Sequence, residues 1–272
     1  MKSILVPTDF SEVAVNATEF AFELSKYLDE HVILLHAYQR PFMLSSLSVA
    51  LAEPILERAS IDDFITENST LIADYPYQAH LEPYIYNGKV VDAIQEVIDE
   101  KEVDYVVMGI TGSSKLTEIL MGSNAITAIQ EINKPIFIIP IEGQFKKFEH
   151  CLWVHNYEEK IAPATLEEIK KICLRFNSNL SIIGRTKADL EYFDEAKAHL
   201  GKVLADAGMS KINFLLSFSD EETIVNEINE INNLSLIIMT HTLGTESKLF
   251  HQDNATLMAF HTHIPLLVLN GF

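Results

Sequence analysis

Three glycines and a serine are concentrated in the stretch MGITGSSKLTEILMGSNAITAI, residues 108–129. Gly109 is followed after two residues by Gly112, and after nine more by Gly122 and Ser123. The 272-residue chain has only ten glycines, so three in this one stretch is an unusual concentration. Glycine lets the backbone approach a ligand closely, and a helix N-terminus offers unpaired N–H groups with about half a positive charge. The stretch predicts a phosphate-binding loop leading into a helix, with Ser123 as its N-cap.

Two common phosphate-binding motifs do not fit this stretch. The Walker loop needs Gly-Lys-Ser or Gly-Lys-Thr after four spacer residues, and the dinucleotide fingerprint needs G-x-G-x-x-G. A second polar candidate, Asp9, follows the apolar run Ile4–Pro7 near the amino terminus. A carboxylate in that position can accept hydrogen bonds from the hydroxyl groups of a ribose.

The elements that would position these residues alternate along the chain. Short runs rich in β-branched residues are separated by stretches of helical periodicity, which is typical of βαβ units and a parallel sheet. Helices are expected after Ser11, a suitable N-cap, and from Val90. Gly109 then lies at the carboxyl end of a strand, where open parallel sheets bind ligands. In the first half, strands are expected at 4–7, 32–37, 79–86, 105–108 and 136–139.

This order of elements repeats in the second half. DYVVMG at 104–109 is echoed by SLIIMT at 235–240, and PIFIIP at 135–140 by PLLVLN at 265–270. Matches in order at one offset of about 130 residues indicate a tandem duplication. We therefore predict an α/β protein of two doubly wound domains, each with a five-stranded parallel sheet. Their predicted bounds are 1–143 and 148–272, joined by a short polar linker.

The glycine spacing resembles the nucleotide-binding signature of the universal stress protein family. ILVPTDFS at 4–11, VILLHAY at 32–38 and NKPIFIIP at 133–140 are similar to the first, second and closing strands of that family. The resemblance covers residues 1–140 and implies a Rossmann-like fold of the adenine-nucleotide alpha-hydrolase type. It also implies that ATP or a related adenine nucleotide binds in the first half.

Residue roles can be carried over from ATP-binding members of the family. There, the turn after the first strand contacts ribose and adenine, the second strand lines the adenine pocket, and the glycine loop surrounds the phosphates. These roles fall on Pro7, Thr8, Asp9, Ala37, Met108, Gly109, Gly112, Gly122, Ser123 and Asn124. Ile110 stands where many members have a basic or polar residue. Neutralisation of the phosphates would then rest on Lys115, the helix terminus and a bound Mg²⁺.

The second half has lost the corresponding residues. Thr240 stands opposite Gly109, Leu243 opposite Gly112, and Asp253 opposite Ser123; Asn156 stands opposite Asp9. An aspartate about 4 Å from a phosphate charge costs on the order of 4 kcal/mol, or roughly three decades of affinity. We expect a degenerate partner domain. The resemblance implies that its closing strand, 266–269, lies near 136–139, as in a dimer made covalent; pairing with a second chain remains open.

These features favour a stress-response signalling protein in which the bound nucleotide changes the loop 110–121 and so the contacts with a protein partner. No nucleophile with an adjacent base is recognisable, so we expect slow ATP hydrolysis at most. One alternative is a nucleotide-independent scaffold whose second half binds a protein or an apolar ligand. Another, ranked last, is an adenylating enzyme, because the pyrophosphatase loops of such relatives are missing.

Composition excludes several other classes of function. The net charge of −19 would repel nucleic acid. No apolar run is long enough for a membrane span, and the first residues lack the hydrophobic stretch of a signal peptide, so a cytoplasmic protein is expected. Cys151 and Cys173 are too few for a disulfide framework. His261 and His263 could ligate a metal, but scattered histidines are the preferred interpretation and no metal site is predicted from them.

Overall fold

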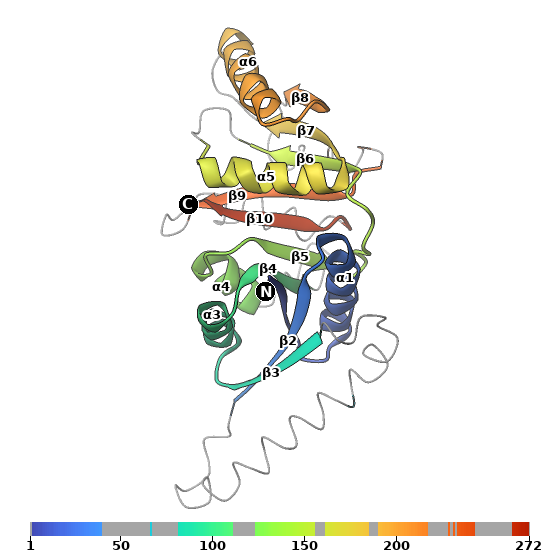
Figure 1. Cartoon of the computed structure of the whole chain (residues 1–272), viewed down its shortest axis with the longest axis vertical. Coiled ribbons are helices and arrows are strands. Elements are labelled where there is room, and N and C mark those ends of the chain that lie inside the picture. Colours follow the sequence, from blue (N-terminus) through green and yellow to red (C-terminus); the bar gives the residue numbers. More distant parts are fainter. Residues whose placement is uncertain are drawn as a thin grey trace, which may run out of the picture. The chain divides into compact units, whose positions relative to one another are not determined.

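The computed structural model describes residues 2–39, 66, 81–110, 123–155, 161–184, 190–216, 228, 231, 233–242 and 263–271. The chain divides into two compact units, residues 1–109 and 110–272, which are described separately here (Figure 1). None of the described helices has both the length and the hydropathy needed to cross a bilayer.

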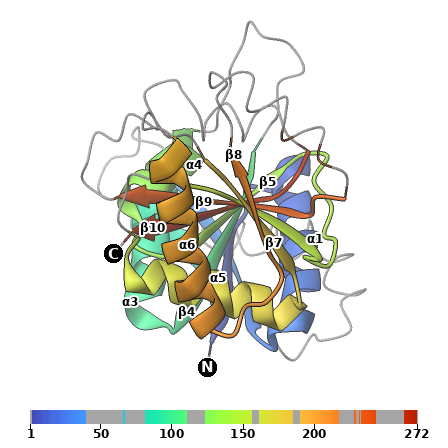
Figure 2. The same ribbon diagram turned by 90° about the horizontal axis from the view of Figure 1, so that it is seen from above.

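The first unit is a parallel sheet with a helix on each face. Its strands are β1 (Ser3–Pro7), β2 (His31–Tyr38), β3 (Leu81–Asn87) and β4 (Val103–Ile110), in the order β3-β2-β1-β4. Helices α1 (Glu12–Leu28) and α3 (Val90–Glu100) lie on opposite sides of the strands (Figures 1 and 2). The predicted doubly wound α/β architecture is therefore confirmed, and β1 lies where the direction of winding reverses.

Local sequence explains why α1 begins and ends where it does. The Ser11 hydroxyl accepts a hydrogen bond from the Ala14 N–H at 3.3 Å, as predicted for an N-cap. Asp29 ends the helix in the left-handed conformation and donates its N–H to the Ser25 carbonyl. The face turned to the sheet is closely packed, because Ala17, Phe20 and Leu24 are each at most 1% exposed.

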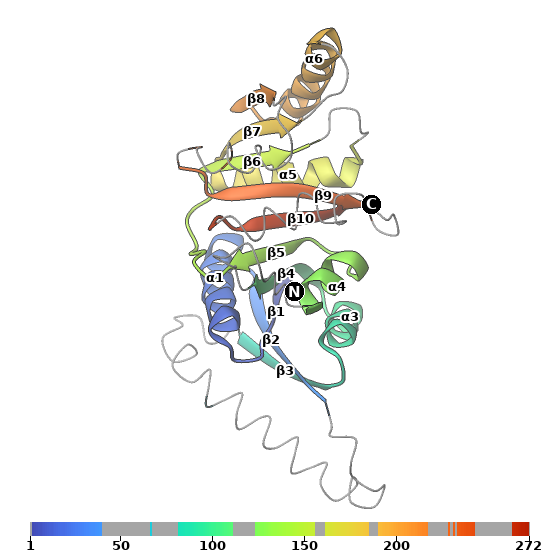
Figure 3. The same cartoon turned by 180° about the vertical axis from the view of Figure 1, so that it is seen from behind.

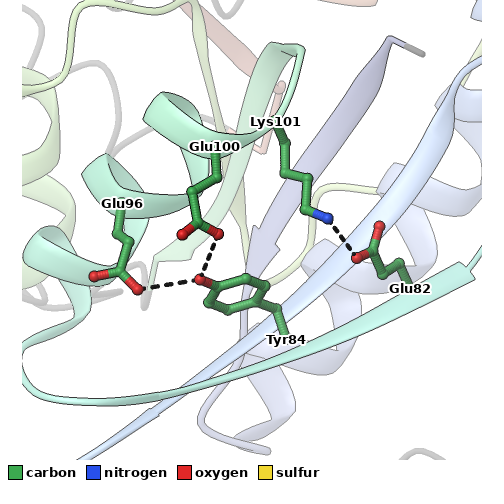
Figure 4. A network of polar contacts seen from close by, with 5 residues as sticks. All are labelled: Glu82, Tyr84, Glu96, Glu100 and Lys101. Carbon is green, nitrogen blue, oxygen red and sulfur yellow. Dashed lines mark hydrogen bonds and ion pairs between the residues drawn. The ribbon is translucent and has the colours of Figure 1, made fainter.

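A polar cluster attaches α3 to β3, the outermost strand in the order β3-β2-β1-β4. The Tyr84 hydroxyl donates to carboxylates of Glu96 at 3.1 Å and Glu100 at 3.0 Å (Figure 4). Partial burial, together with hydrogen bonds to these two carboxylates, raises the pKa of Tyr84. Lys101 and Glu82 form a nearby ion pair at 3.0 Å. We interpret the cluster as structural, since it joins helix to strand.

The second unit repeats the winding of the first. Its strands are β5 (Ile136–Pro140), β6 (His150–Val154), β7 (Asn179–Gly184), β8 (Ile212–Leu216), β9 (Leu236–Thr242) and β10 (Leu266–Gly271). Its helices are α4 (Ser123–Glu131), α5 (Pro163–Phe176) and α6 (Leu190–Asp206). The order β8-β7-β6-β9 matches β3-β2-β1-β4 of the first unit, as a duplication predicts (Figure 3).

One antiparallel pair closes the second unit. Strand β5, from the first half of the sequence, runs antiparallel to β10, with Phe137 opposite Leu267. This confirms the predicted proximity of 136–139 and 266–269. The predicted linker is also part of the packing, because Phe145 contacts Phe148, which is fully buried against Phe137 and Phe176. These aromatic contacts explain why β5 belongs to the second compact unit, while the domain bounds 1–143 and 148–272 stay a prediction.

Candidate nucleotide-binding site

The turn after β1 is held firmly against the neighbouring strand β2. The Thr8 N–H donates to the Leu35 carbonyl at 2.8 Å, and the Thr8 carbonyl lies 2.9 Å from Nδ1 of His36. Because a carbonyl can only accept, His36 carries a proton on Nδ1. The main-chain N–H and the carbonyl of Thr8 are therefore both hydrogen-bonded, and the residue is only 5% exposed.

The next three residues form a pre-ordered turn. The Phe10 N–H donates to the Thr8 hydroxyl at 3.2 Å, and Ser11 donates to Oδ1 of Asp9 through its N–H at 3.1 Å and its hydroxyl at 2.6 Å. Phe10 has φ of 64°, a left-handed conformation that costs a non-glycine residue roughly 1–2 kcal/mol. Its ring packs on His36 at 4.6 Å between centroids. These contacts hold the turn in a shape that the backbone alone would not favour.

Six of the sequence-predicted site residues come together at this edge of the first unit. The carboxylate of Asp9 is exposed, Ala37 and Gly109 are half-buried, and Thr8 is buried. The other two, Pro7 and Met108, are buried and stand at the ends of β1 and β4. The parallel register, with Pro7 opposite Leu35 and Leu5 opposite Val106, brings these strand ends to one side.

Gly109 has a packing role that the sequence did not reveal. A Cβ added there would lie 2.4 Å from the carbonyl oxygen of Val13 and 2.5 Å from its Cγ1. Atoms in proteins do not approach this closely, so a side chain at 109 would push β4 and the first turn of α1 apart. The contact with α1 therefore explains why this residue is glycine, without reference to a ligand.

The rest of the predicted phosphate loop lies mostly outside the described residues, which applies to Gly112, Lys115 and Gly122. Ser123 and Asn124 open helix α4 in the second unit, and Asn124 is exposed. The helix includes Ser123 itself, so it begins one residue earlier than an N-cap at that position would place it. Ile110, the departure from the family pattern, is a buried strand residue with 2% exposure.

Sequence reasoning missed Phe10 and His36. Each supports the turn through a contact between different elements, and neither fits a recognisable spacing motif. The only available signal was position, since His36 immediately precedes Ala37 and Phe10 follows Asp9.

The corresponding turn of the second unit has a different chemistry. His155 occupies the place of Thr8, and its N–H donates to Ile183 at 2.9 Å, as that of Thr8 does to Leu35. Its ring stacks on Trp153 at 4.7 Å, and burial lowers the pKa of His155 to about 4. The imidazole is therefore neutral at pH 7. Thr240 is half-buried; the other predicted counterparts, Asn156, Leu243 and Asp253, lie outside the described residues.

Metal-ligating residues do not gather in the described part of the chain, where no three His, Cys, Asp or Glu side chains form a cluster. His263 has its Nδ1 3.1 Å from a carboxylate oxygen of Glu142, an exposed contact in the second unit. His261, its predicted partner in a metal site, lies outside the described residues.

Comparison with known proteins gives consistent matches. The sequence model of the universal stress protein family matches residues 1–140. Two universal stress proteins of Methanocaldococcus jannaschii, MJ0531 and MJ0577, are 26% and 27% identical over 141 and 152 residues. Each alignment covers 51% of this chain, with 81% of the first protein and 94% of the second.

Solved structures extend the similarity in fold to the whole chain. A universal stress protein from Archaeoglobus fulgidus superimposes with a TM-score of 0.74 at 18% identity, covering 98% of both chains. A putative universal stress protein from Pseudomonas aeruginosa gives a TM-score of 0.59 at 11% identity, covering 99% of this chain and 93% of the other. The similarity in fold therefore covers both halves of the chain.

Proposed function

The chain belongs to the universal stress protein family, and we propose that it binds one adenine nucleotide, ATP in the first instance, through its amino-terminal half. In this proposal the protein acts in signalling through the bound nucleotide, and it hydrolyses that nucleotide slowly or not at all. The observation that carries the proposal is the pre-ordered turn of residues 7–11, which presents an exposed carboxylate where the winding of the sheet reverses.

The nucleoside end of the ligand is matched to the described residues. Open α/β sheets bind ligands at the point of reversal beyond the carboxyl ends of their strands. There Asp9 can accept hydrogen bonds from ribose hydroxyls, since its second oxygen remains accessible while Oδ1 accepts from Ser11. Half-buried Ala37 offers a small apolar surface and its backbone to the adenine. A turn that is already ordered loses little entropy on binding.

The phosphate end is assigned from the sequence. Gly112, Gly122, Ser123 and Asn124 supply backbone N–H groups and a helix N-terminus, and Lys115 supplies a positive charge. Mg²⁺ usually takes one or two protein ligands and completes its shell with phosphate oxygens and waters, so it needs no preformed cluster of side chains. We propose that any Mg²⁺ arrives with the nucleotide. A bound nucleotide would then order the loop 110–121 and alter the surface offered to a protein partner.

The proposal is tested by thermal melting of the full chain with and without ATP and Mg²⁺. The wild-type protein is expected to melt higher with nucleotide, because a ligand that binds only the folded state stabilises it. Gly122→Asp places a carboxylate beside the phosphates, which costs about 4 kcal/mol at a near-surface dielectric, so the shift should disappear. Gly244→Asp is the matched control in the second half, and it should keep the shift.

Co-purified ligand gives a second, independent readout. Protein denatured after purification should release an adenine nucleotide into the supernatant, and Gly122→Asp protein should release much less. If no nucleotide is released and the wild-type protein shows no shift, the proposal is wrong and the scaffold interpretation takes its place. An equal loss of the shift in both glycine variants would also count against a single amino-terminal site.

A further inference from the structure

Phe10 has a backbone conformation that its residue type does not favour. Among the described residues, four non-glycine residues have positive φ, and the other three are Asp29, Asn177 and Asn233. Aspartate and asparagine tolerate the left-handed conformation, because a short polar side chain can hydrogen-bond locally, whereas a bulky aromatic side chain cannot. Asp29 and Asn177 also end helices, where this conformation is common. Phe10 ends no helix, so its conformation needs another explanation.

One side chain of β2 contacts the turn on both sides of Asp9. The ring of Phe10 lies 4.6 Å from the ring of His36, measured between centroids. Nδ1 of His36 donates to the Thr8 carbonyl at 2.9 Å, and the Thr8 hydroxyl accepts from the Phe10 N–H at 3.2 Å. Phe10 and His36 are both half-buried, so their contact lies at the surface of the first unit. His36 therefore holds the main chain before Asp9 and the side chain after it.

We propose that Phe10 and His36 are positioning residues for the nucleotide, because their contact keeps the Asp9 carboxylate in the orientation that binds. This inference rests on the proposed function and extends it to two residues outside the glycine motif. The link to Asp9 is short, since the next residue, Ser11, donates its N–H at 3.1 Å and its hydroxyl at 2.6 Å to Oδ1. A change in φ at Phe10 would move Ser11 away from Asp9 and release the carboxylate.

The size of the effect follows from the populations of the turn. Without a supporting contact, the left-handed conformation is disfavoured about tenfold in a residue that has a Cβ. Glycine adopts left-handed and right-handed backbone about equally. When a ligand binds only one conformation, its apparent dissociation constant is the intrinsic constant divided by the populated fraction of that conformation. Loss of the Phe10 ring alone should therefore weaken ATP binding about tenfold, and loss of the ring and Cβ together only about twofold.

The test compares Phe10→Ala with Phe10→Gly in calorimetric titrations of the full chain with ATP and Mg²⁺. Both variants lose the ring, but only alanine keeps the backbone penalty. We expect the dissociation constant to rise about tenfold in Phe10→Ala and about twofold in Phe10→Gly. His36→Ala should also weaken binding. Its effect should be smaller in the Phe10→Ala background than in the wild type, because the ring that His36 supports is already absent.

Amide hydrogen exchange gives a readout that needs no nucleotide. The Ser11 N–H is bonded to Asp9 in the ordered turn, so its exchange rate reports how often the turn opens. Without ligand, exchange at Ser11 should be about tenfold faster in Phe10→Ala than in the wild type, and the increase in Phe10→Gly should be smaller. The Thr8 N–H, which donates to the Leu35 carbonyl, is the internal control and should exchange as in the wild type.

Equal losses of affinity in Phe10→Ala and Phe10→Gly would overturn the inference, because they would show that the ring itself, and not the backbone conformation, matters for binding. Wild-type affinity and wild-type Ser11 exchange in Phe10→Ala would overturn it as well. Failure of the proposed function looks different. In that case the wild-type protein binds no ATP, and the positioning role falls with the nucleotide site, whereas unaltered variants of an ATP-binding wild type refute the positioning role alone.

Discussion

Replacing Gly109 by alanine tests whether β4 really approaches α1 as closely as the structure has it. The added Cβ would stand 2.4 Å from the Val13 carbonyl oxygen and 2.5 Å from Val13 Cγ1. Overpacking of this kind costs about 1–3 kcal/mol. Loss of glycine's freedom in the unfolded chain returns about 0.4–1 kcal/mol. We therefore expect Gly109→Ala to destabilise the protein by about 1–2 kcal/mol.

Urea unfolding followed by far-UV circular dichroism measures this effect. Fluorescence of Trp153, the single tryptophan, reports on the second unit alone and should change less. Val13→Ala removes the Cγ1 part of the clash but leaves the carbonyl, so combining it with Gly109→Ala should recover only part of the loss.

Gly201→Ala is the matched control. A Cβ at Gly201 would make only an ordinary contact, 3.6 Å from the Phe214 ring, and the residue lies inside helix α6. That change should stabilise the protein by about 0.5–1 kcal/mol. If Gly109→Ala is as stable as the wild type, the packing explanation fails, and the glycine must be explained by a ligand instead.

Two further predictions concern the second unit. Burial depresses the pKa of His155 from its usual 6.5 to about 4, so the unfolded chain binds a proton more readily and stability falls as the pH drops through this window. Lowering the pH from about 7.5 to about 5 should cost about 2 kcal/mol through this residue, and urea titrations of His155→Phe should show a correspondingly weaker dependence. Phe148→Ala removes a fully buried ring that packs against three others, so it should lower the free energy of unfolding by about 3–5 kcal/mol. Phe145→Ala removes a half-buried ring and should lower it by only about 1 kcal/mol. Urea unfolding monitored by Trp153 fluorescence measures both losses of stability. If the two variants lose equal stability, the described packing of Phe148 and Phe145 is wrong.

Sequence was sufficient where the determinants are local. The strands around Ile4 and Val32 and the Ser11 cap follow from composition and periodicity, and the internal repeat predicted the repeated winding. These features need only short windows, or a comparison of the chain with itself. The proximity of 136–139 and 266–269 was instead implied by the resemblance to a known family.

Contacts between elements could not be predicted in the same way. The left-handed Phe10 resting on His36 and the approach of Gly109 to Val13 each depend on how separate segments pack. The linker shows the same limit. Its residues are mostly polar in sequence, yet Phe145 joins a ring cluster with Phe148 that no local pattern indicates.

Calorimetric titration of the full chain with ATP and Mg²⁺ is the most direct test of the proposed nucleotide site, because it measures how many nucleotides bind to each chain. We expect one nucleotide per chain, and Asp9→Ala should weaken binding while the same substitution at Asn156 leaves it unchanged. Two nucleotides per chain, or binding that survives Asp9→Ala but not Asn156→Ala, would show that the assignment to the amino-terminal half is wrong.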